Sequence, residues 1–251
     1  MRRWVLVAVV VGFLALLPAQ AHGAVLDTGY RPDRDGFGFA NFGDPGLPGS
    51  AGLKALVPGG LHDEIFSHTG HCFGMAEASV ANFLDGNASI FASEAGAMPA
   101  IDRAQTGQSF YYIADFFRAP LGEAPDNGAG FAKLCDRLSA GRPAVLGIYS
   151  SENSGPGHAV VAYRVDRDGE DACIYVYDPN LPPTLHDYDA EPLIAVYDAA
   201  NGTFSYDNGR TFDEMKVDDL DGAGVELGKS ITLGLMAFPM FLGALVIRRH
   251  K

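Results

Sequence analysis

The sequence predicts an α+β fold in which amino-terminal helices pack on a mainly antiparallel sheet. Two observations favour this class. Apolar residues recur at helical spacing between residues 72 and 141, whereas short strand-like runs fill residues 143–206. The runs are separated by "RDGED" and "AANGT", which are typical of turns between consecutive antiparallel strands. A group of helices followed by a group of strands is the order found in α+β proteins.

The helical half is expected to hold three segments. Residues 72–84, "CFGMAEASVANFL", carry their larger side chains at helical intervals. Residues 89–117 are helical again, with an interruption expected at Pro99. Residues 128–141 form an amphipathic helix that ends at Gly141. The preceding residues 25–62 are rich in glycine and proline, which predicts a loop with at most one short strand.

The second half is expected to hold five strands. They are residues 143–150, 158–166, 172–179, 193–199 and, less regularly, 203–206. Hairpins at "RDGED" and "AANGT" would make neighbouring strands antiparallel.

The two ends of the chain differ from the rest. Residues 1–24 combine Arg2 and Arg3, a short apolar run and the small residues of "PAQAHGA", which is typical of a secretory signal peptide. Residues 229–251 hold the apolar run "ITLGLMAFPMFLGALVI" followed by "RRHK". This pattern favours a transmembrane segment with a basic cytoplasmic tail over a buried helix. Residues 25–228 are then one extracellular domain at the cell membrane.

Charge limits the partners of this domain. It contains all 31 acidic residues and only 12 of the 18 basic residues. Such an excess of negative charge disfavours nucleic acids and anionic lipid surfaces. We expect no nucleic-acid partner, and membrane attachment only through the carboxyl-terminal helix. The sequence indicates no cofactor, and no metal ligand is assigned. "DRDG" (33–36) and "DDLDG" (218–222) lack the glutamate that a 12-residue calcium loop needs, which leaves only a calcium site of another geometry open.

Cys72, His158 and Asp178 are the candidate catalytic residues. Cys72 opens a predicted helix, whose amino end stabilises a thiolate. His158 begins a strand after the glycine-rich "GPG", and Asp178 ends the next strand in "YVYDPN". Both lie about ten residues from the centre of the intervening hairpin turn, so the antiparallel register would bring them together. The aspartate would orient the imidazole, and the imidazole would activate the thiol.

Four stretches of the sequence resemble papain-like cysteine peptidases: "GHCFGMA", "GRPAVLGIY", "GHAVVAYRV" and "IYVYDPN". The resemblance covers residues 37–206 and is greatest to the compact branch that includes bacteriocin leader-processing peptidases and their secreted bacterial relatives. It implies a papain-like fold with Cys72 as nucleophile, His158 as base and Asp178 as the orienting residue.

The sequence departs from this family in two ways. The signature around the cysteine of papain itself is absent, and Cys72 and His158 are only 86 positions apart, which fits the compact branch. The family also has a glutamine upstream of the cysteine to hold the oxyanion, but no glutamine lies between Gln20 and Gln105. Asn41 is the candidate oxyanion donor, with His71 and His68 as weaker alternatives.

The expected function is an exported, surface-anchored cysteine peptidase, or an amide or acyl transferase, acting on a peptide or protein substrate. The alternative is a non-catalytic papain-like binding or adhesion module on the cell surface. Two further matters stay open at this stage. Cys135 and Cys173 could form a disulfide or be buried thiols, and residues 25–36 could be removed as a propeptide.

Overall fold

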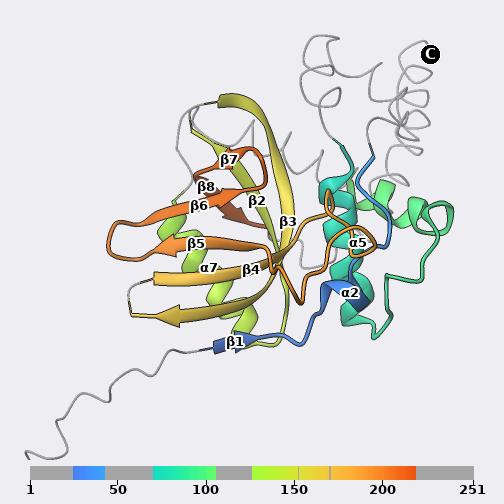
Figure 1. Ribbon diagram of the computed structural model, residues 1–251, viewed down its shortest axis with the longest axis horizontal. Coiled ribbons are helices and arrows are strands. Elements are labelled where there is room, and N and C mark those ends of the chain that lie inside the picture. The colour runs from blue at the N-terminus through green and yellow to red at the C-terminus, as the bar shows by residue number, and fades with distance from the viewer. Residues whose placement is uncertain (1–24, 43–69, 106–125, 152, 170, 219–251) are drawn as a thin grey trace, which may run out of the picture.

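The computed structural model describes residues 25–42, 70–105, 126–151, 153–169 and 171–218 (Figure 1). The described chain is α+β, with a few helices and a mainly antiparallel, nearly closed sheet, which confirms the predicted class. The elements are β1 (Val25–Asp27), α2 (Pro32–Asp35), α5 (Cys72–Leu84), α7 (Asn127–Ser139), β2 (Ala144–Ser150), β3 (Asn153–Asp168), β4 (Asp171–Tyr177), β5 (Ile194–Asp198), β6 (Thr203–Asp207), β7 (Thr211–Phe212) and β8 (Glu214–Val217). Residues 94–105 are also helical.

The sheet curls until its two ends meet. Its strand order is β7-β6-β5-β4-β3-β2-β8, and β1 pairs with β3 outside this path. The outermost strands β7 and β8 are consecutive in the chain, with only Asp213 between them. The ends of the sheet are therefore joined covalently, and few strand edges are left open.

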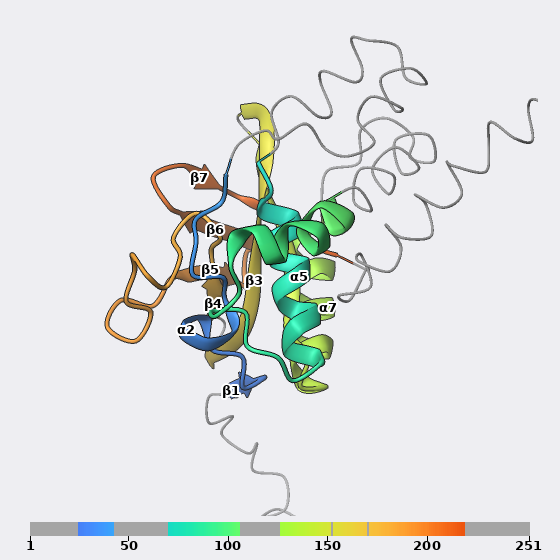
Figure 2. The same cartoon turned by 90° about the vertical axis from the view of Figure 1, so that its right-hand side faces the viewer.

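The two faces of the sheet pack against different helices. Alternate residues of a strand point to opposite faces, and β2 and β3 divide in this way. Leu146, Val160 and Ala162 belong to the cluster that includes Leu134 and Leu138 of α7. The other face carries Val145, Ala159 and Val161 against α5, whose contribution is Phe73, Ala76 and Val80. Figures 1 and 2 show α5 beside β3 and α7 across the other face.

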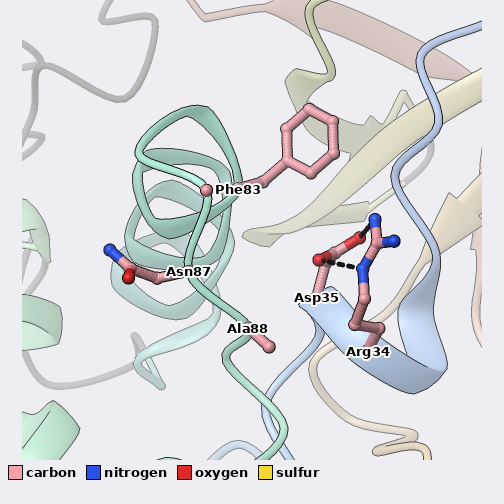
Figure 3. Close-up of a pocket in the computed structure, with 6 residues that line it drawn as sticks. Arg34, Asp35, Phe83, Asn87 and Ala88 are labelled. Atoms are coloured by element: carbon pink, nitrogen blue, oxygen red, sulfur yellow. Dashed lines mark hydrogen bonds and ion pairs between the residues drawn. The ribbon is translucent and has the colours of Figure 1, made fainter.

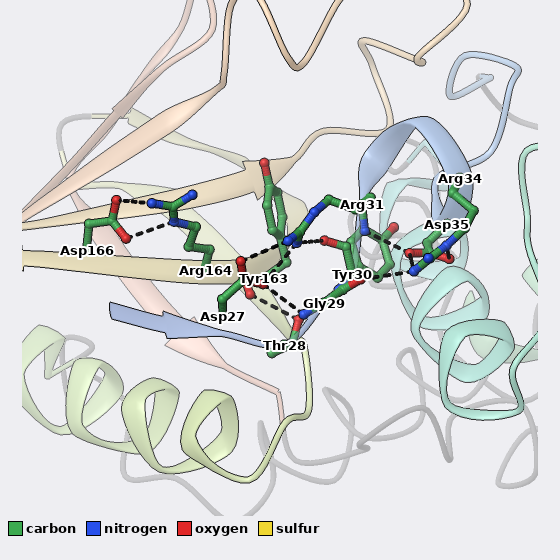
Figure 4. Close-up of polar contacts among 10 residues, drawn as sticks. All are labelled: Asp27, Thr28, Gly29, Tyr30, Arg31, Arg34, Asp35, Tyr163, Arg164 and Asp166. Carbon is green, nitrogen blue, oxygen red and sulfur yellow. Dashed lines mark hydrogen bonds and ion pairs between the residues drawn. The ribbon is translucent and has the colours of Figure 1, made fainter. Parts of the chain in front are cut away.

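The segment before α2 is an integral part of this fold (Figure 4). β1 pairs with β3, with Val25 opposite Asp166. Tyr30 is fully buried, and its hydroxyl donates to Ser79 Oγ on α5 at 3.1 Å. Asp27 accepts two hydrogen bonds from the Arg31 guanidinium, both at 2.9 Å. Removing residues 25–36 would strip a core tyrosine and an edge strand, which argues against this stretch being a propeptide.

In the described residues, the predicted elements agree with the structure apart from two details, and residues 106–117 of the predicted helical segment 89–117 lie outside these residues. Helix 94–105 runs through Pro99, where an interruption was expected. The short elements α2, β7 and β8 were not predicted, because two to four residues carry too little periodicity. The predicted signal peptide 1–24 and transmembrane segment 229–251 lie outside the described residues. Among the described residues, no helix is long and apolar enough to span a membrane.

Candidate functional site

Cys72 is the first residue of α5. His71 is the N-cap residue, and its carbonyl accepts the Met75 N–H at 2.8 Å. The N–H groups of the first helical turn have no partners within the helix. One of them, from Gly74, donates instead to the side chain of Gln105 at 2.8 Å. A side chain at position 74 would collide with the Ile101 carbonyl, so glycine lets helix 94–105 approach this end of α5 closely.

His158 lies on β3, opposite Ile148 of β2 and next to a bulge in the β2–β3 pairing. Its side chain is only 8% exposed. The imidazole Nε2 lies 2.7 Å from Oδ1 of Asp178, the first residue after β4. The hairpin register therefore brings together the two residues expected to meet. Since Nε2 faces Asp178, Nδ1 is the ring nitrogen left for the thiol.

Asp178 is fully buried, and four groups hydrogen-bond its carboxylate. Oδ1 accepts hydrogen bonds from His158 Nε2 and from the backbone N–H of Asn180, the latter at 2.8 Å. Oδ2 accepts from the Tyr206 hydroxyl at 3.0 Å and from Asn208 Nδ2 at 2.8 Å. A buried carboxylate with donors on both oxygens is stable in its ionised form.

The ionisation of this pair follows from its surroundings. Burial on its own would lower the pKa of His158, but hydrogen bonds with Asp178 and the Cys72 side chain outweigh it and raise that pKa to about 10. Burial would raise the pKa of Asp178, yet its bonds to His158, Asn180 and Asn208 hold that pKa below its usual value. At neutral pH the site therefore contains an imidazolium between a carboxylate and the Cys72 thiol.

Asn41 lies at this site but is engaged with another amide. Its Nδ2 donates to Asn180 Oδ1 at 2.9 Å, and its backbone N–H donates to the Pro179 carbonyl at 2.7 Å. Asn180 Nδ2 lies 3.4 Å from His158 Nε2. The structure thus places Asn41 next to the histidine–aspartate pair, through Asn180.

The weaker oxyanion candidates differ in position. His68 lies outside the described residues. His71 is buried, with Nδ1 at 3.2 Å from the Phe42 carbonyl and Nε2 at 3.3 Å from Asp102 Oδ1. Its ring also stacks on Phe42, with centroids 4.5 Å apart. His71 therefore supports the start of α5 from the side of residues 42 and 102.

Four polar residues of this region were not among the predicted site residues. They are Gln105, Asn180, Tyr206 and Asn208. Asn180 could have been found, because it belongs to the "DPN" motif that supplied Asp178. Tyr206 and Asn208 reach Asp178 only because the curled sheet brings β6 and its following turn to the end of β4, and no local pattern indicates this.

The other two cysteines form no disulfide, because all three cysteines are free thiols. The Arg167 guanidinium donates to Cys135 Sγ at 2.8 Å and covers the Phe131 ring at 5.0 Å from its centroid. In the parts of the chain that the structure describes, no group of three or more histidine, cysteine, aspartate or glutamate side chains could hold a metal ion.

A pocket of about 310 Å³ lies elsewhere, at the carboxyl end of α5 (Figure 3). Its lining is Arg34, Asp35, Phe83, Gly86, Asn87 and Ala88. Arg34 is paired with Asp35, with a shortest distance of 2.7 Å. A rise of about 1.5 Å per residue puts Cys72 and Phe83 roughly 16 Å apart along the helix. The pocket is therefore separate from the cysteine–histidine–aspartate site.

Comparison of the chain with protein-family models, with curated proteins and with solved structures gave no match. The chemistry of the site must be judged from its own geometry. A thiol beside a protonated imidazole, with the imidazole held by a buried carboxylate, is an arrangement able to generate a thiolate and to return a proton to a leaving group.

Proposed function

We propose that the protein is a thiol hydrolase or acyl transferase in which Cys72 is the nucleophile, His158 the acid and base, and Asp178 the orienting residue. The observation that carries the proposal is the buried 2.7 Å contact between His158 Nε2 and Asp178 Oδ1. The side chain of Cys72, in the first turn of α5, is hydrogen-bonded to the same imidazole. Nucleophile, base and orienting group are the three parts that covalent thiol catalysis requires.

The proposed reaction has two halves. The Cys72 thiolate attacks an acyl carbon, and the protonated His158 gives its Nδ1 proton to the departing amine, which leaves a thioester on Cys72. Neutral His158 then takes a proton from water, or from an acceptor amine, as that molecule attacks the thioester. Collapse of this intermediate releases the acid or new amide, and Cys72 regains a thiolate beside an imidazolium. Hydrolysis and transfer differ only in the attacking molecule.

The backbone N–H of Cys72 is the proposed oxyanion donor. Cys72 occupies the first helical position of α5, where an N–H has no acceptor within the helix. The helix dipole also favours negative charge at this end. A donor fixed in the backbone needs no reorganisation when the oxyanion forms. The expectation that Asn41 adds a second donor stays a prediction, because the described bond of its amide is to Asn180.

A papain-like fold is the finer structural proposal. In its support, the nucleophile lies on a helix early in the chain, while His158 and Asp178 lie on consecutive strands of the following antiparallel sheet. Peptide or protein substrates are the class that this resemblance favours.

Export with a carboxyl-terminal membrane anchor is proposed from the two end segments, residues 1–24 and 229–251. A reporter active only outside the cytoplasm, fused near position 220, should be active. An inactive fusion at that position would contradict export.

The decisive experiment is alkylation of the full chain with iodoacetamide, followed by peptide mapping. Cys72 should react near pH 6 faster than Cys173, the internal control thiol, which is also free and partly buried. His158→Ala should move the onset of Cys72 alkylation to higher pH, and Cys72→Ser should abolish turnover of acyl substrates. Slow labelling of Cys72 from pH 5 to pH 8, unchanged in His158→Ala, would overturn the catalytic proposal and favour a binding module.

A further inference from the structure

Asn41 connects the two halves of the proposed site, which come from distant parts of the chain. On one side, its backbone N–H donates to the Pro179 carbonyl and its side chain donates to the Asn180 side chain; both residues come directly after Asp178. On the other side, it packs against Gly70, two positions before Cys72. A Cβ at position 70 would lie 2.7 Å from Asn41 Nδ2, so any other residue there would push this amide out of its position.

The contacts of the next residue strengthen this connection. The Phe42 carbonyl lies 3.4 Å from the N–H and 3.2 Å from Nδ1 of His71, the N-cap residue of α5. The Phe42 ring stacks on the His71 imidazole. Residues 41 and 42 are thus bonded to the loop that carries Asp178 and to the residue before Cys72. Any shift of this segment would change how the imidazole faces the thiol.

Asn180 transmits the contact to His158. Its backbone N–H donates to the same Asp178 oxygen that holds His158, and its side chain reaches to 3.4 Å from Nε2. Asn180 is exposed, whereas His158 and Asp178 are buried. Its amide therefore lies on the solvent side of the buried pair, where fixing it limits the access of water to the Nε2–Oδ1 bond. Hydrogen bonds between charged groups are stronger where water is excluded.

The oxygen of the Asn41 amide can still accept a hydrogen bond from Asn180. Asn41 Oδ1 is buried and has no hydrogen-bond partner among the described residues. If both amides turned over, Asn180 Nδ2 would donate to Asn41 Oδ1, and Asn180 Oδ1 would face His158 Nε2 as a second acceptor. Because Nε2 of the imidazolium carries a proton, this second orientation gives it a further acceptor, and the packing of Asn41 between Gly70 and Pro179 is retained.

From these contacts we infer that Asn41 is a positioning residue, which acts through Asn180 to hold His158 in line between Asp178 and Cys72. This role deepens the proposed function and rests on it. It differs from an oxyanion donor, because Asn41 would act on the imidazole before any acyl substrate arrives. Among the residues that the structure describes, the titratable groups that face His158 are Asp178 and Cys72, with Tyr206 bonded to the other oxygen of Asp178.

The test compares Asn41→Ala, Asn41→Asp, Asn180→Ala and the double variant Asn41→Ala/Asn180→Ala in the full chain. The control is Asn201→Ala, in the exposed turn between β5 and β6. Alkylation by iodoacetamide is a displacement that forms no oxyanion, so only a change at the imidazole can alter its pH profile. Asn41→Ala should slow alkylation of Cys72 at pH 6 by about fivefold, the factor that one ordinary hydrogen bond accounts for.

Three further results are expected. Asn41→Asp keeps the shape and an acceptor for Asn180 Nδ2, so it should react closer to the unmodified chain than Asn41→Ala does. Asn180→Ala should slow the reaction by a similar factor, and the double variant should be no slower than the single variants, because both residues act along one path. Asn201→Ala should react like the unmodified chain.

A second readout keeps this inference separate from the catalytic proposal. The titration midpoint of the His158 ring, followed by NMR, should fall in Asn41→Ala whether or not the chain hydrolyses any substrate. An unchanged midpoint and an unchanged alkylation profile would overturn the positioning role. If slower acyl transfer accompanied that result, Asn41 would be an oxyanion donor. Unreactive Cys72 with a lowered His158 midpoint in Asn41→Ala would support the positioning role and reject the catalytic one.

Discussion

Two histidine–aspartate pairs flank Cys72, and they differ in how the carboxylate is held. In the first, His158 Nε2 lies 2.7 Å from Asp178 Oδ1. In the second, His71 Nε2 lies 3.3 Å from Asp102 Oδ1, within ion-pair range but without the geometry of a hydrogen bond. The pKa of Asp178 is held below its usual value, whereas burial raises the pKa of Asp102 despite the nearby histidine.

The difference teaches that a direct hydrogen bond from the histidine, supported by further donors, decides the ionisation of a buried carboxylate. The bond to His158 is the largest of the effects that lower the pKa of Asp178, ahead of the bonds from Asn180 and Asn208. Asp178 is the more deeply buried of the two, yet it is the one whose pKa is lowered. Its other three donors come from Asn180, Tyr206 and Asn208. These groups favour the ionised form, and an ionised Asp178 in turn favours the imidazolium of His158. A pair of this kind suits acid–base chemistry, and the His71 pair suits support of the helix start.

The largest effect is expected from neutralising each aspartate in turn. All four groups bonded to the Asp178 carboxylate can act as donors. In Asp178→Asn the new NH₂ group would face donors on whichever side it lies, so at least one hydrogen bond is lost. We expect Asp178→Asn to lower the free energy of unfolding by about 3 kcal/mol, as for other broken buried pairs. Asp102→Asn should cost about 1 kcal/mol or less, because burial already favours the neutral form there.

Urea unfolding of both variants, followed by circular dichroism, measures this difference. Equal losses of stability would mean that the donors around Asp178 do not distinguish the two pairs. Alkylation of Cys72 should slow in Asp178→Asn and stay close to its original rate in Asp102→Asn.

The sequence predicts this comparison only in part. The hairpin "RDGED" makes β3 and β4 antiparallel, and counting residues from its turn brings His158 to the same end of the hairpin as Asp178. The pairing itself ends at Val161 opposite Tyr177, after a shift near Ala162, so the 2.7 Å contact of the two side chains is seen only in the structure. The donors to Asp178 Oδ2 come from a different strand pair. Tyr206 and Asn208 approach because the sheet curls, and curl depends on the summed twist of many strands.

The amino-terminal segment was the part least accessible to sequence reasoning. Its glycines and prolines predicted a loop, yet Tyr30 is a fully buried core residue. Of this segment only Asn41 was predicted to lie at the site, where its amide is bonded to Asn180. Irregular segments carry no period from which a buried face could be inferred. Their place is determined by single contacts, such as the Tyr177 hydroxyl accepting the Phe37 N–H at 3.1 Å.

A second, smaller effect concerns pH. The folded-state pKa of His158 is about 10, above the value of 6.5 expected for an unfolded chain. The folded protein therefore binds more protons between these values, and its stability must fall as pH rises from 6.5 to 10. The stabilisation from His158 is complete below pH 6.5. The chain should lose on the order of 2 kcal/mol relative to His158→Gln across this window, after allowance for coupling to Cys72.

Urea titrations at pH 6, 8 and 10 test this dependence, with His158→Gln measured in parallel. The variant should be the less stable protein at pH 6 and approach the unmodified chain at pH 10. A difference that stays constant with pH would contradict an imidazolium at this site. Asp178 acts in the opposite direction. Its pKa is lowered in the folded protein, so its contribution to stability is lost only in acid, as pH falls below about 3.9, the ordinary pKa of an aspartate.

The smallest loss of stability is expected from removing the Tyr206 hydroxyl. This variant tests most directly whether the donors to Asp178 distinguish its pair with His158 from the His71–Asp102 pair. Tyr206→Phe removes one of the two donors to Asp178 Oδ2 and leaves Asn208 in place. We expect a loss of about 1 kcal/mol in stability, the usual value for one buried hydrogen bond. The pKa of Asp178 should rise, which weakens its hold on the His158 imidazolium and lowers the titration midpoint of that ring.

Tyr197→Phe, on the neighbouring strand β5, is the matched control, since Tyr197 is also buried but belongs to the apolar stack with Phe131. If both tyrosine variants left the His158 midpoint where it was, the Asp178 donors would contribute only to folding. A lower midpoint in Tyr206→Phe alone would show that β6, a strand with no residue in the proposed triad, sets the proton affinity of the histidine.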